Sequence, residues 1–369
     1  MPLLAQPFRR TLSILATAAL ALSLTGFAPA PAAAGAPLAT VTAQPAVATV
    51  VPTATRAATP LKVGTFNIRC ANCSTGSRVN SREKNWETRR GAVIAQIRSE
   101  APHVFGVQEA SPGVLKSNRS RSQYDDLVAR LGGSYKITDA SRYNCAKSTS
   151  YKKCRKVDQD ASGDARIIYN SSRLAMLDHG SRQLDKEKAT SGPRFVAWAI
   201  FRDKTDGRKF LFATAHTEPG QSKAKVKLRK KQAGLILDEL RKHNPAKLPV
   251  ILTGDFSSTK LTHAGNPVYD IITKSGLVRD PLGNTRKKKS LSSSVVSKVV
   301  NVQYDTLNDF RTSPTKRRGY ALGAHLDYIL TSKSIKVTQY KVVLSLKNGK
   351  FAGVIPSDHN MVTAVVLLP

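Results

Sequence analysis

The sequence is poor in acidic and in aromatic residues. Its 369 residues contain 25 Asp and Glu against 58 Lys and Arg, which gives a formal net charge of +33, and aromatic residues make up only 6%. Hydrophobic residues still reach 41%, which is enough for a packed core and excludes a wholly disordered protein. The excess of positive charge does not determine a fold, but it favours a polyanionic partner such as a nucleic acid, an anionic membrane surface or a cell-wall polymer.

Long apolar runs are missing except near the N-terminus. There, Arg9 and Arg10 precede an apolar stretch over residues 11–27, and residues 32–34 fit the small-residue pattern of a cleavage site. This pattern predicts a signal peptide over residues 1–34 and therefore secretion, with a single membrane anchor as the alternative. The Ala-, Pro- and Thr-rich residues 35–60 predict a flexible linker. One folded domain is then expected over residues 61–369.

Motifs of several enzyme classes are also missing. The sequence contains no G-x-S-x-G turn, no H-E-x-x-H pair and no P-loop. These absences argue against a serine hydrolase, exclude a zinc peptidase of the H-E-x-x-H type and argue against nucleotide-driven work.

Cysteine is scarce but even in number. Cys70 and Cys73 are three residues apart, and Cys145 and Cys154 are nine apart. In an exported protein this predicts disulfides, and pairing within each local pair is the simplest of three connectivities. A zinc site and a redox-active C-x-x-C pair are the alternatives.

Short β-rich runs alternate with amphipathic stretches from residue 61 onward, which predicts a single α/β domain. Helices are expected over residues 81–100, 124–132 and 223–243. Several predicted strands end in a polar or ionisable residue, which is how a rigid sheet presents chemically active side chains. These positions are Asn67, Glu109, His216, Asp255 and Asp327, and the pair Asp358–His359 precedes the last predicted strand.

These residue types suit the hydrolysis of a phosphodiester. The four carboxylates are hard oxygen ligands of the kind preferred by magnesium, calcium or manganese. Histidine is the residue type suited to acid–base chemistry near neutral pH, so His216 and His359 could move protons. A divalent cation beside a carboxylate-held histidine can support attack of water on a phosphate ester.

The order of the pieces resembles the endonuclease/exonuclease/phosphatase superfamily over residues 61–369. The matching segments are TFNI at residue 65, QEA at 108, TAH at 214, GDF at 254, DYI at 327 and SDH at 357. The resemblance implies a DNase I-like fold, which is a four-layer α/β/β/α sandwich of two packed mixed β-sheets flanked by helices. It also implies that Glu109 binds a metal ion, with help from Asn67 and Asp358, and that the ion is Mg²⁺, Mn²⁺ or Ca²⁺.

The same resemblance implies the catalytic roles. Asp327 orients His359, which acts as general base, and Asp255 positions the attacking water or the phosphate. His216 contacts the phosphate and assists the leaving group. Members of the family often give that histidine an acidic partner, for which Asp164 is the nearest candidate in this sequence.

Two departures from the family pattern stand out. Ser257 replaces the asparagine that usually follows the GDF aspartate by two residues, so phosphate contact is expected to be weaker or mediated by water. The arginine that DNase I itself carries after the metal glutamate is absent, because Ala110 and Ser111 follow Glu109. This weakens a close match to DNase I but not to the superfamily.

Basic segments follow or precede the strands that carry these residues. The most basic is residues 221–231, which contains Arg229, Lys230 and Lys231, and others are residues 284–290 and 316–318. Lysine and arginine at the rim of the site would bind a phosphate backbone without reading its sequence. We therefore expect a secreted, monomeric nuclease with no stable membrane insertion after cleavage of the signal peptide. The alternatives are a sphingomyelinase or phospholipase C-type enzyme and a non-catalytic polyanion-binding protein.

Overall fold

The computed structural model describes residues 57–71, 73, 82–110, 115–118, 120–138, 143–144, 155–156, 165–185, 194–261, 267–283 and 296–369. All of them lie within the unit Thr55–Pro369. The predicted signal peptide, Cys145, Cys154 and Asp164 lie outside the described residues.

A seven-stranded mixed sheet contains the first and the last strand of this unit as neighbours. β1 pairs parallel with β2 and antiparallel with β16. In spatial order the strands are β11 (Val296–Val300), β13 (Lys336–Val342), β16 (Val362–Leu367), β1 (Leu61–Asn67), β2 (Val104–Gln108), β6 (Arg166–Asn170) and β3 (Tyr135–Ile137).

A five-stranded mixed sheet packs against the first. Its β10 pairs parallel with β9 and antiparallel with β12. In spatial order the strands are β12 (Asp327–Thr331), β10 (Val250–Asp255), β9 (Lys209–His216), β8 (Arg194–Asp203) and β7 (Leu174–Leu184). The remaining described strands form two short antiparallel pairs. One pair is β4 (Tyr143–Asn144) with β5 (Arg155–Lys156), and the other is β14 (Leu346–Lys347) with β15 (Lys350–Phe351).

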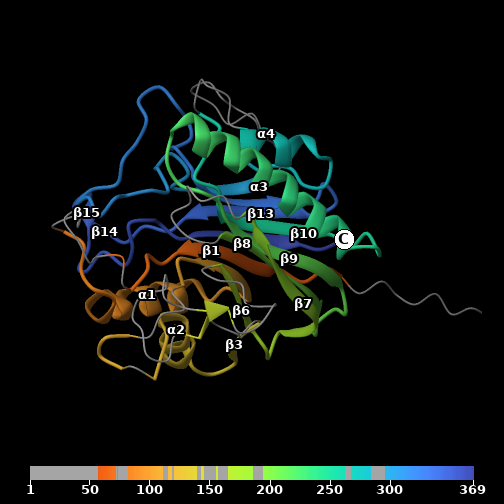
Figure 1. The fold of residues 1–369 in the computed structure, drawn as a ribbon, viewed down its shortest axis with the longest axis horizontal. Helices are drawn as coiled ribbons and strands as arrows, with labels where there is room; N and C mark the ends of the chain where they lie inside the picture. The colour runs from red at the N-terminus through yellow and green to blue at the C-terminus, as the bar shows by residue number, and fades with distance from the viewer. Residues whose placement is uncertain are drawn as a thin grey trace, which may run out of the picture. The chain divides into compact units, whose positions relative to one another are not determined.

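Within the described residues, four helices cover the outer faces of the two sheets. The described helices are α1 (Trp86–Glu100), α2 (Gln123–Leu131), α3 (Lys223–Lys242) and α4 (Pro267–Lys274). Helices α1 and α2 lie on the side of the seven-stranded sheet, and α3 and α4 lie on the other side (Figure 1). The predicted α/β/β/α sandwich is therefore confirmed. None of the helices in the described residues is long and apolar enough to span a membrane.

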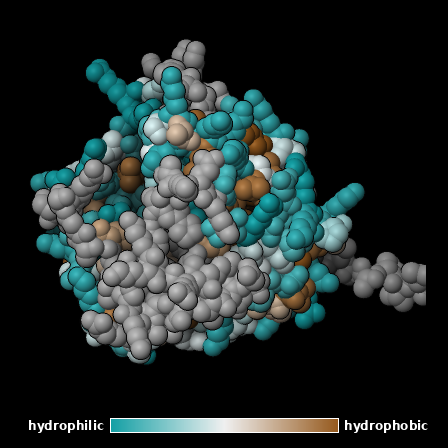
Figure 2. Space-filling model, in the orientation of Figure 1, coloured by the Kyte–Doolittle hydropathy of each residue, from teal (hydrophilic) through white to brown (hydrophobic). Residues whose placement is uncertain are grey.

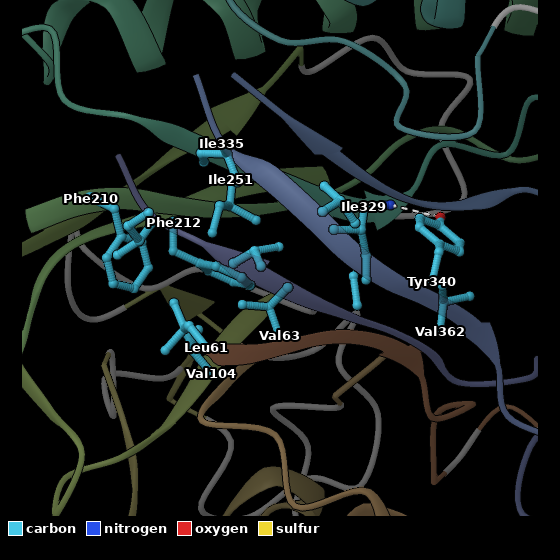
Figure 3. Close-up of a cluster of buried hydrophobic side chains, with 14 of the residues drawn as sticks. Leu61, Val63, Val104, Phe210, Phe212, Ile251, Ile329, Ile335, Tyr340 and Val362 are labelled. Carbon is cyan, nitrogen blue, oxygen red and sulfur yellow. Dashed lines mark hydrogen bonds between the residues drawn. The ribbon is translucent and has the colours of Figure 1, made fainter. Parts of the chain in front are cut away.

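The core that joins the sheets is formed by the inward-facing residues of both. Figure 3 shows Leu61 and Val63 of β1 facing Phe212 of β9 and Ile251 of β10. The two sheets approach closely at Gly106, where a Cβ atom would overlap the hydroxyl of Thr214. Removing this apolar surface from water stabilises the sandwich by roughly 25 cal/mol per Å² buried. The packed sheets hold their strand ends in fixed positions.

The predicted helices are present with changed boundaries. The helix expected from residue 81 begins at Trp86, because the side chain of Asn85 accepts a hydrogen bond from the amide of Thr88 and caps the helix there. The helix expected over residues 223–243 is α3, and Ser222 caps its first turn.

Candidate active site

The side chains expected at the strand ends meet where the two sheets end together. In the five-stranded sheet Asp255 lies between His216 on one neighbouring strand and Asp327 on the other. From the seven-stranded sheet, Asn67 donates from Nδ2 to Asp255 Oδ2 at 3.0 Å and to Glu109 Oε1 at 3.2 Å. One amide therefore links the two sheets at the site. In this structure Asn67 orients carboxylates, and its Oδ1 accepts from the backbone N–H of Arg69.

Glu109 adopts a backbone conformation that is uncommon for its residue type. Its φ is 58°, directly after the end of β2, and this turns the carboxylate toward the loop that follows β1. The backbone N–H of Cys70 donates to Glu109 Oε2 at 3.1 Å. Burial alone would raise the pKa of Glu109, but His216, Arg69 and these hydrogen bonds outweigh it and lower the pKa to about 2. Glu109 is therefore an anionic oxygen ligand at neutral pH.

Glu109 and Asp358 both lie beside the guanidinium of Arg69. The Arg69 guanidinium nitrogen Nη1 lies 3.8 Å from Glu109 Oε2 and 3.8 Å from Asp358 Oδ2. The two carboxylates keep 18% and 14% of their side-chain surface exposed, so an ion from solvent can reach them. Burial raises the pKa of Asp358 and the Glu109 charge adds to it, although His359 and Arg69 oppose the shift.

This donor set fits a hard divalent cation. A cation between two partly buried carboxylates would relieve the repulsion that raises the Asp358 pKa, and oxygen donors suit Mg²⁺ or Mn²⁺. A second group with metal-ligand spacing is formed by Asp255, Asp327 and His359, whose ligand atoms lie within 4.8 Å of one another. The structure thus offers a carboxylate pair and a carboxylate–histidine group side by side.

Asp358 is held by backbone contacts from three parts of the chain. The Ser357 hydroxyl donates to the carbonyl of Asn67 at 2.6 Å and to Asp358 Oδ1 at 3.1 Å. The amides of Asn308 and Asp309 both donate to the Asp358 carbonyl. The segment over residues 306–310 therefore positions the loop that carries Asp358.

Asp327 and His359 form a buried hydrogen-bonded pair. His359 Nδ1 lies 2.8 Å from Asp327 Oδ2, and its Nε2 lies 3.6 Å from Asp255 Oδ2. Burial lowers the pKa of His359, but Asp327 and Asp255 outweigh it and hold the pKa well above its usual value. The two carboxylates therefore stabilise the imidazolium form, which is the form a general base takes after accepting a proton.

His216 contacts a residue that the sequence did not suggest. Arg194, at the start of β8, places Nη1 2.8 Å from His216 Nδ1, and His216 Nε2 lies 3.7 Å from Asp255 Oδ2. Arg194 also pairs with the buried Glu218 at 3.6 Å. The sequence did offer one indication of this role, because Arg194 directly precedes a run of apolar strand residues. A charged side chain at the end of a strand can reach the ends of neighbouring strands.

Ser257 is occupied by backbone contacts. Its amide donates to Asp255 Oδ1 at 2.8 Å, and its hydroxyl donates to the carbonyl of Thr217 at 3.3 Å. The residue has a φ of 47°, a region that asparagine adopts more readily than serine. Ser257 thus orients Asp255 through its amide, while its short side chain is turned to the protein.

Comparison with known proteins identifies the family. The sequence model described as the Endonuclease/Exonuclease/phosphatase family matches residues 64–359. The chain belongs to this family. Its matched region begins within β1 and ends at His359, so it includes each of the site residues Asn67, Glu109, His216, Asp255, Asp327 and Asp358. A sequence comparison with curated proteins gives no match.

Solved structures of the family share the fold. An endonuclease/exonuclease/phosphatase family protein from Bacteroides thetaiotaomicron has 21% identity and a TM-score of 0.60, covering 85% of this chain and 99% of that one. A mannosyl-6-phosphatase from the same species has 20% identity and a TM-score of 0.59, covering 84% and 100%. D. rerio TDP2 in complex with a single-strand DNA product has 18% identity and a TM-score of 0.52, covering 84% and 99%.

The basic residues of α3 occupy two different environments. Arg229 is only 2% exposed, and its guanidinium donates to the carbonyls of Glu218 and Gly220. It therefore stabilises the loop after β9, in contrast to the predicted substrate contact. Lys230 and Lys231 are exposed, and Lys231 lies 3.7 Å from Asp185.

A disulfide lies beside the candidate metal ligands of this family member. Cys70 and Cys73 are bonded, as the sequence predicted for the local pair. The buried guanidinium of Arg89 donates to the carbonyls of Ile68, Arg69, Cys70 and Pro356. It therefore ties the disulfide loop to the segment before Asp358, a role that its place within a helix did not indicate.

Proposed function

We propose that the protein is a secreted, divalent-metal-dependent phosphodiesterase that hydrolyses the backbone of a nucleic acid. The observation that carries this proposal is the buried Asp327–His359 pair beside the Glu109 and Asp358 carboxylates. Secretion rests on the predicted signal peptide at residues 1–34. We expect the mature chain to act as a monomer.

Each of the described site residues has its own role in the proposed reaction. Glu109 and Asp358 would hold the cation, which when bound supplies positive charge that neutralises the phosphate oxygens. In its neutral form, which the positive charge of a bound cation would favour, His359 can accept the proton of the attacking water at Nε2, and Asp327 stabilises the resulting imidazolium. Asp255 lies 3.6 Å from His359 and 3.7 Å from His216, so it can orient the water between the two rings.

His216 and Arg194 are placed to contact the phosphate itself. Arg194 brings a guanidinium to the edge of the His216 ring at 2.8 Å. Both groups can donate hydrogen bonds to phosphate oxygens, on which negative charge increases during the reaction. They are therefore assigned to binding the phosphate and supporting the leaving oxygen.

A nucleic acid is the favoured substrate because of charge. The chain carries a net charge of +33, and the described part of α3 exposes Lys223, Lys227, Lys230 and Lys231 close after the His216 strand. Figure 2 shows a mostly hydrophilic face among its coloured residues. Among proteins of the same fold, the TDP2 structure contains a single-strand DNA product.

The proposal is tested by incubating the purified protein with plasmid DNA and with RNA in the presence of Mg²⁺. We expect cleavage that stops on addition of EDTA and falls by about 10²–10⁴-fold in His359→Ala. Cleavage that persists in EDTA, or that equals wild type in the variant, contradicts the mechanism. A panel with a sugar phosphate and sphingomyelin vesicles separates this function from other phosphate ester hydrolyses.

A lipid phosphodiester is the second candidate, for one structural reason. Leu346, in the β14–β15 hairpin, is 37% exposed, and Val354, four residues before Asp358, is 41% exposed. Lys347 and Lys350 lie in the same hairpin. Apolar and basic side chains therefore come shortly before Asp358 in the sequence. Such a combination suits the interface of an anionic membrane. Preferential hydrolysis of sphingomyelin vesicles over DNA would favour this candidate.

A further inference from the structure

The disulfide loop brings sulfur atoms to a candidate ligand of the catalytic cation. Cys73 Sγ lies 3.8 Å from Glu109 Oε2, and the amide of Cys70 donates to the same oxygen at 3.1 Å. One ligand atom each from Cys70, Cys73 and Glu109 lies within 4.8 Å of the other two. Cys73 is exposed, so a reductant in solution can reach the disulfide.

The loop is held in place by contacts that do not depend on the disulfide. Arg89 donates to the carbonyl of Cys70 and to those of the two residues before it. Gln123 accepts from the amide of Ala71 at 2.8 Å and donates to the carbonyl of Arg69 at 2.8 Å. Breaking the sulfur–sulfur bond therefore leaves Cys70 anchored next to Glu109, and Cys73 remains three residues away in a tight turn.

We propose that reduction of the Cys70–Cys73 disulfide creates a zinc site from these two cysteines and Glu109, which takes Glu109 away from the catalytic cation. A phosphine reductant and one water break the S–S bond, giving two thiols and a phosphine oxide. Zinc then displaces the two thiol protons to solvent and binds two sulfur atoms and one carboxylate oxygen. A water completes the tetrahedral set that zinc prefers.

The two oxidation states would thus select different metals. With the disulfide intact, the two sulfur atoms are bonded to each other, and the Glu109 carboxylate offers oxygen, which suits Mg²⁺. With the disulfide reduced, thiolates are available, and these favour Zn²⁺ over Mg²⁺. The zinc site itself stands independently of the reaction, whereas its competition with Mg²⁺ rests on the proposed phosphodiesterase function.

The site is tested in a Cys145→Ser/Cys154→Ser background, so that Cys70 and Cys73 are the remaining cysteines. Co²⁺ replaces Zn²⁺ as the probe, because bonds from thiolate to cobalt give a charge-transfer absorption band. After reduction with a phosphine, we expect this band to saturate at about one cobalt per chain and to disappear on adding Zn²⁺. The oxidised protein should show no band. A reduced, folded protein without the band overturns the proposal.

Two variants identify the ligands. Cys73→Ser should abolish the two-thiolate band while circular dichroism shows the same fold. Glu109→Gln should keep both thiols but weaken zinc binding about tenfold or more, because a carboxylate ligand is lost. Unchanged zinc affinity in Glu109→Gln overturns the assignment of Glu109.

Competition is measured as Mg²⁺-dependent hydrolysis in the same background. We expect micromolar Zn²⁺ to inhibit the reduced protein much more strongly than the oxidised protein. Equal inhibition of both forms contradicts competition at this loop. If no substrate is hydrolysed in either state, the cobalt spectra still decide whether the zinc site exists, so failure of the proposed function and failure of the site are separate results.

Discussion

At the scale of single residues, Ser257 stands where the family resemblance predicts an asparagine. Its backbone has a φ of 47° and its hydroxyl is turned to the Thr217 carbonyl. Asparagine tolerates this backbone and carries an amide that can donate to a phosphate. We expect Ser257→Asn to lower KM for the phosphodiester by about two- to tenfold, equivalent to one hydrogen bond of about 0.5–1.5 kcal/mol. Steady-state kinetics measure it, and an unchanged or higher KM argues against phosphate contact at this position.

His325 makes the stability of the fold depend on pH. Burial, with Lys260 adding to it, lowers the pKa of His325 to about 4, and its Nε2 lies 2.9 Å from the Val302 carbonyl. The unfolded chain takes up this proton as the pH falls below about 6.5, whereas the folded chain does not until about 4. The contribution of His325 to the free energy of unfolding is therefore complete above pH 6.5, the pKa in the unfolded chain. It decreases by roughly 3 kcal/mol as the pH falls from there to about 4.

The measurement is urea unfolding in EDTA at about pH 7.5 and pH 5, for wild type and His325→Gln. Glutamine can keep the hydrogen bond to Val302 but does not titrate. Wild type should lose about 2 kcal/mol more than the variant between the two pH values. Equal losses would show that His325 does not carry this pH dependence.

At the scale of strands and helices, the glycine of the GDF motif serves packing. Gly254 lies in β10 with a φ of 145°, and a Cβ there would overlap the carbonyl oxygen of Ala215 on β9. We expect Gly254→Ala to lower the free energy of unfolding by about 2–4 kcal/mol. Gly91 in α1 is the matched control, because a Cβ there meets nothing within 4 Å. Gly91→Ala should stabilise the protein by about 0.5–1 kcal/mol. Similar effects of the two substitutions in urea unfolding would contradict this account.

The elements that the sequence predicted well are those with a local pattern. β1, β2, β9 and β10 are apolar runs that end in a polar residue, and the sheet order then places those ends together. α4 was not predicted, because its eight residues give too short a helical period to distinguish from a loop. Arg229 was misplaced although its spacing with Ala233 and Ile236 put it on the buried stripe of α3.

The site residues that the sequence missed act through contacts between distant segments. Arg194 reaches His216 across 22 positions, and Arg89 reaches the carbonyl of Pro356 across 267. Nothing in the local pattern around an arginine tells which distant carbonyl or ring it will meet. The family motifs therefore predicted the residues proposed for the reaction, whereas the residues that hold them in place required the fold.

At the scale of the whole molecule, the net charge of +33 predicts a salt-dependent KM for a nucleic acid. The logarithm of KM should rise linearly with the logarithm of salt concentration. Lys230→Gln should reduce the slope by about one unit if Lys230 contacts a phosphate. Lys333 is the control, because it is also exposed and lies beyond the end of β12 opposite to Asp327. An identical slope in both variants would remove Lys230 from the binding surface.

The pairing of β1 with β16 affects when a newly made chain becomes active. Asn67 and Glu109 are synthesised early, but Asp358 and His359 follow about 250 to 290 residues later, and Arg89 joins the two segments. On a ribosome, the nascent polypeptide therefore lacks the second candidate metal ligand and the proposed general base until residue 359 has been made. A protein whose proposed target is nucleic acid would thus be harmless to the cell's own messages and genome throughout translation, and any premature stop before residue 358 would yield an inert product.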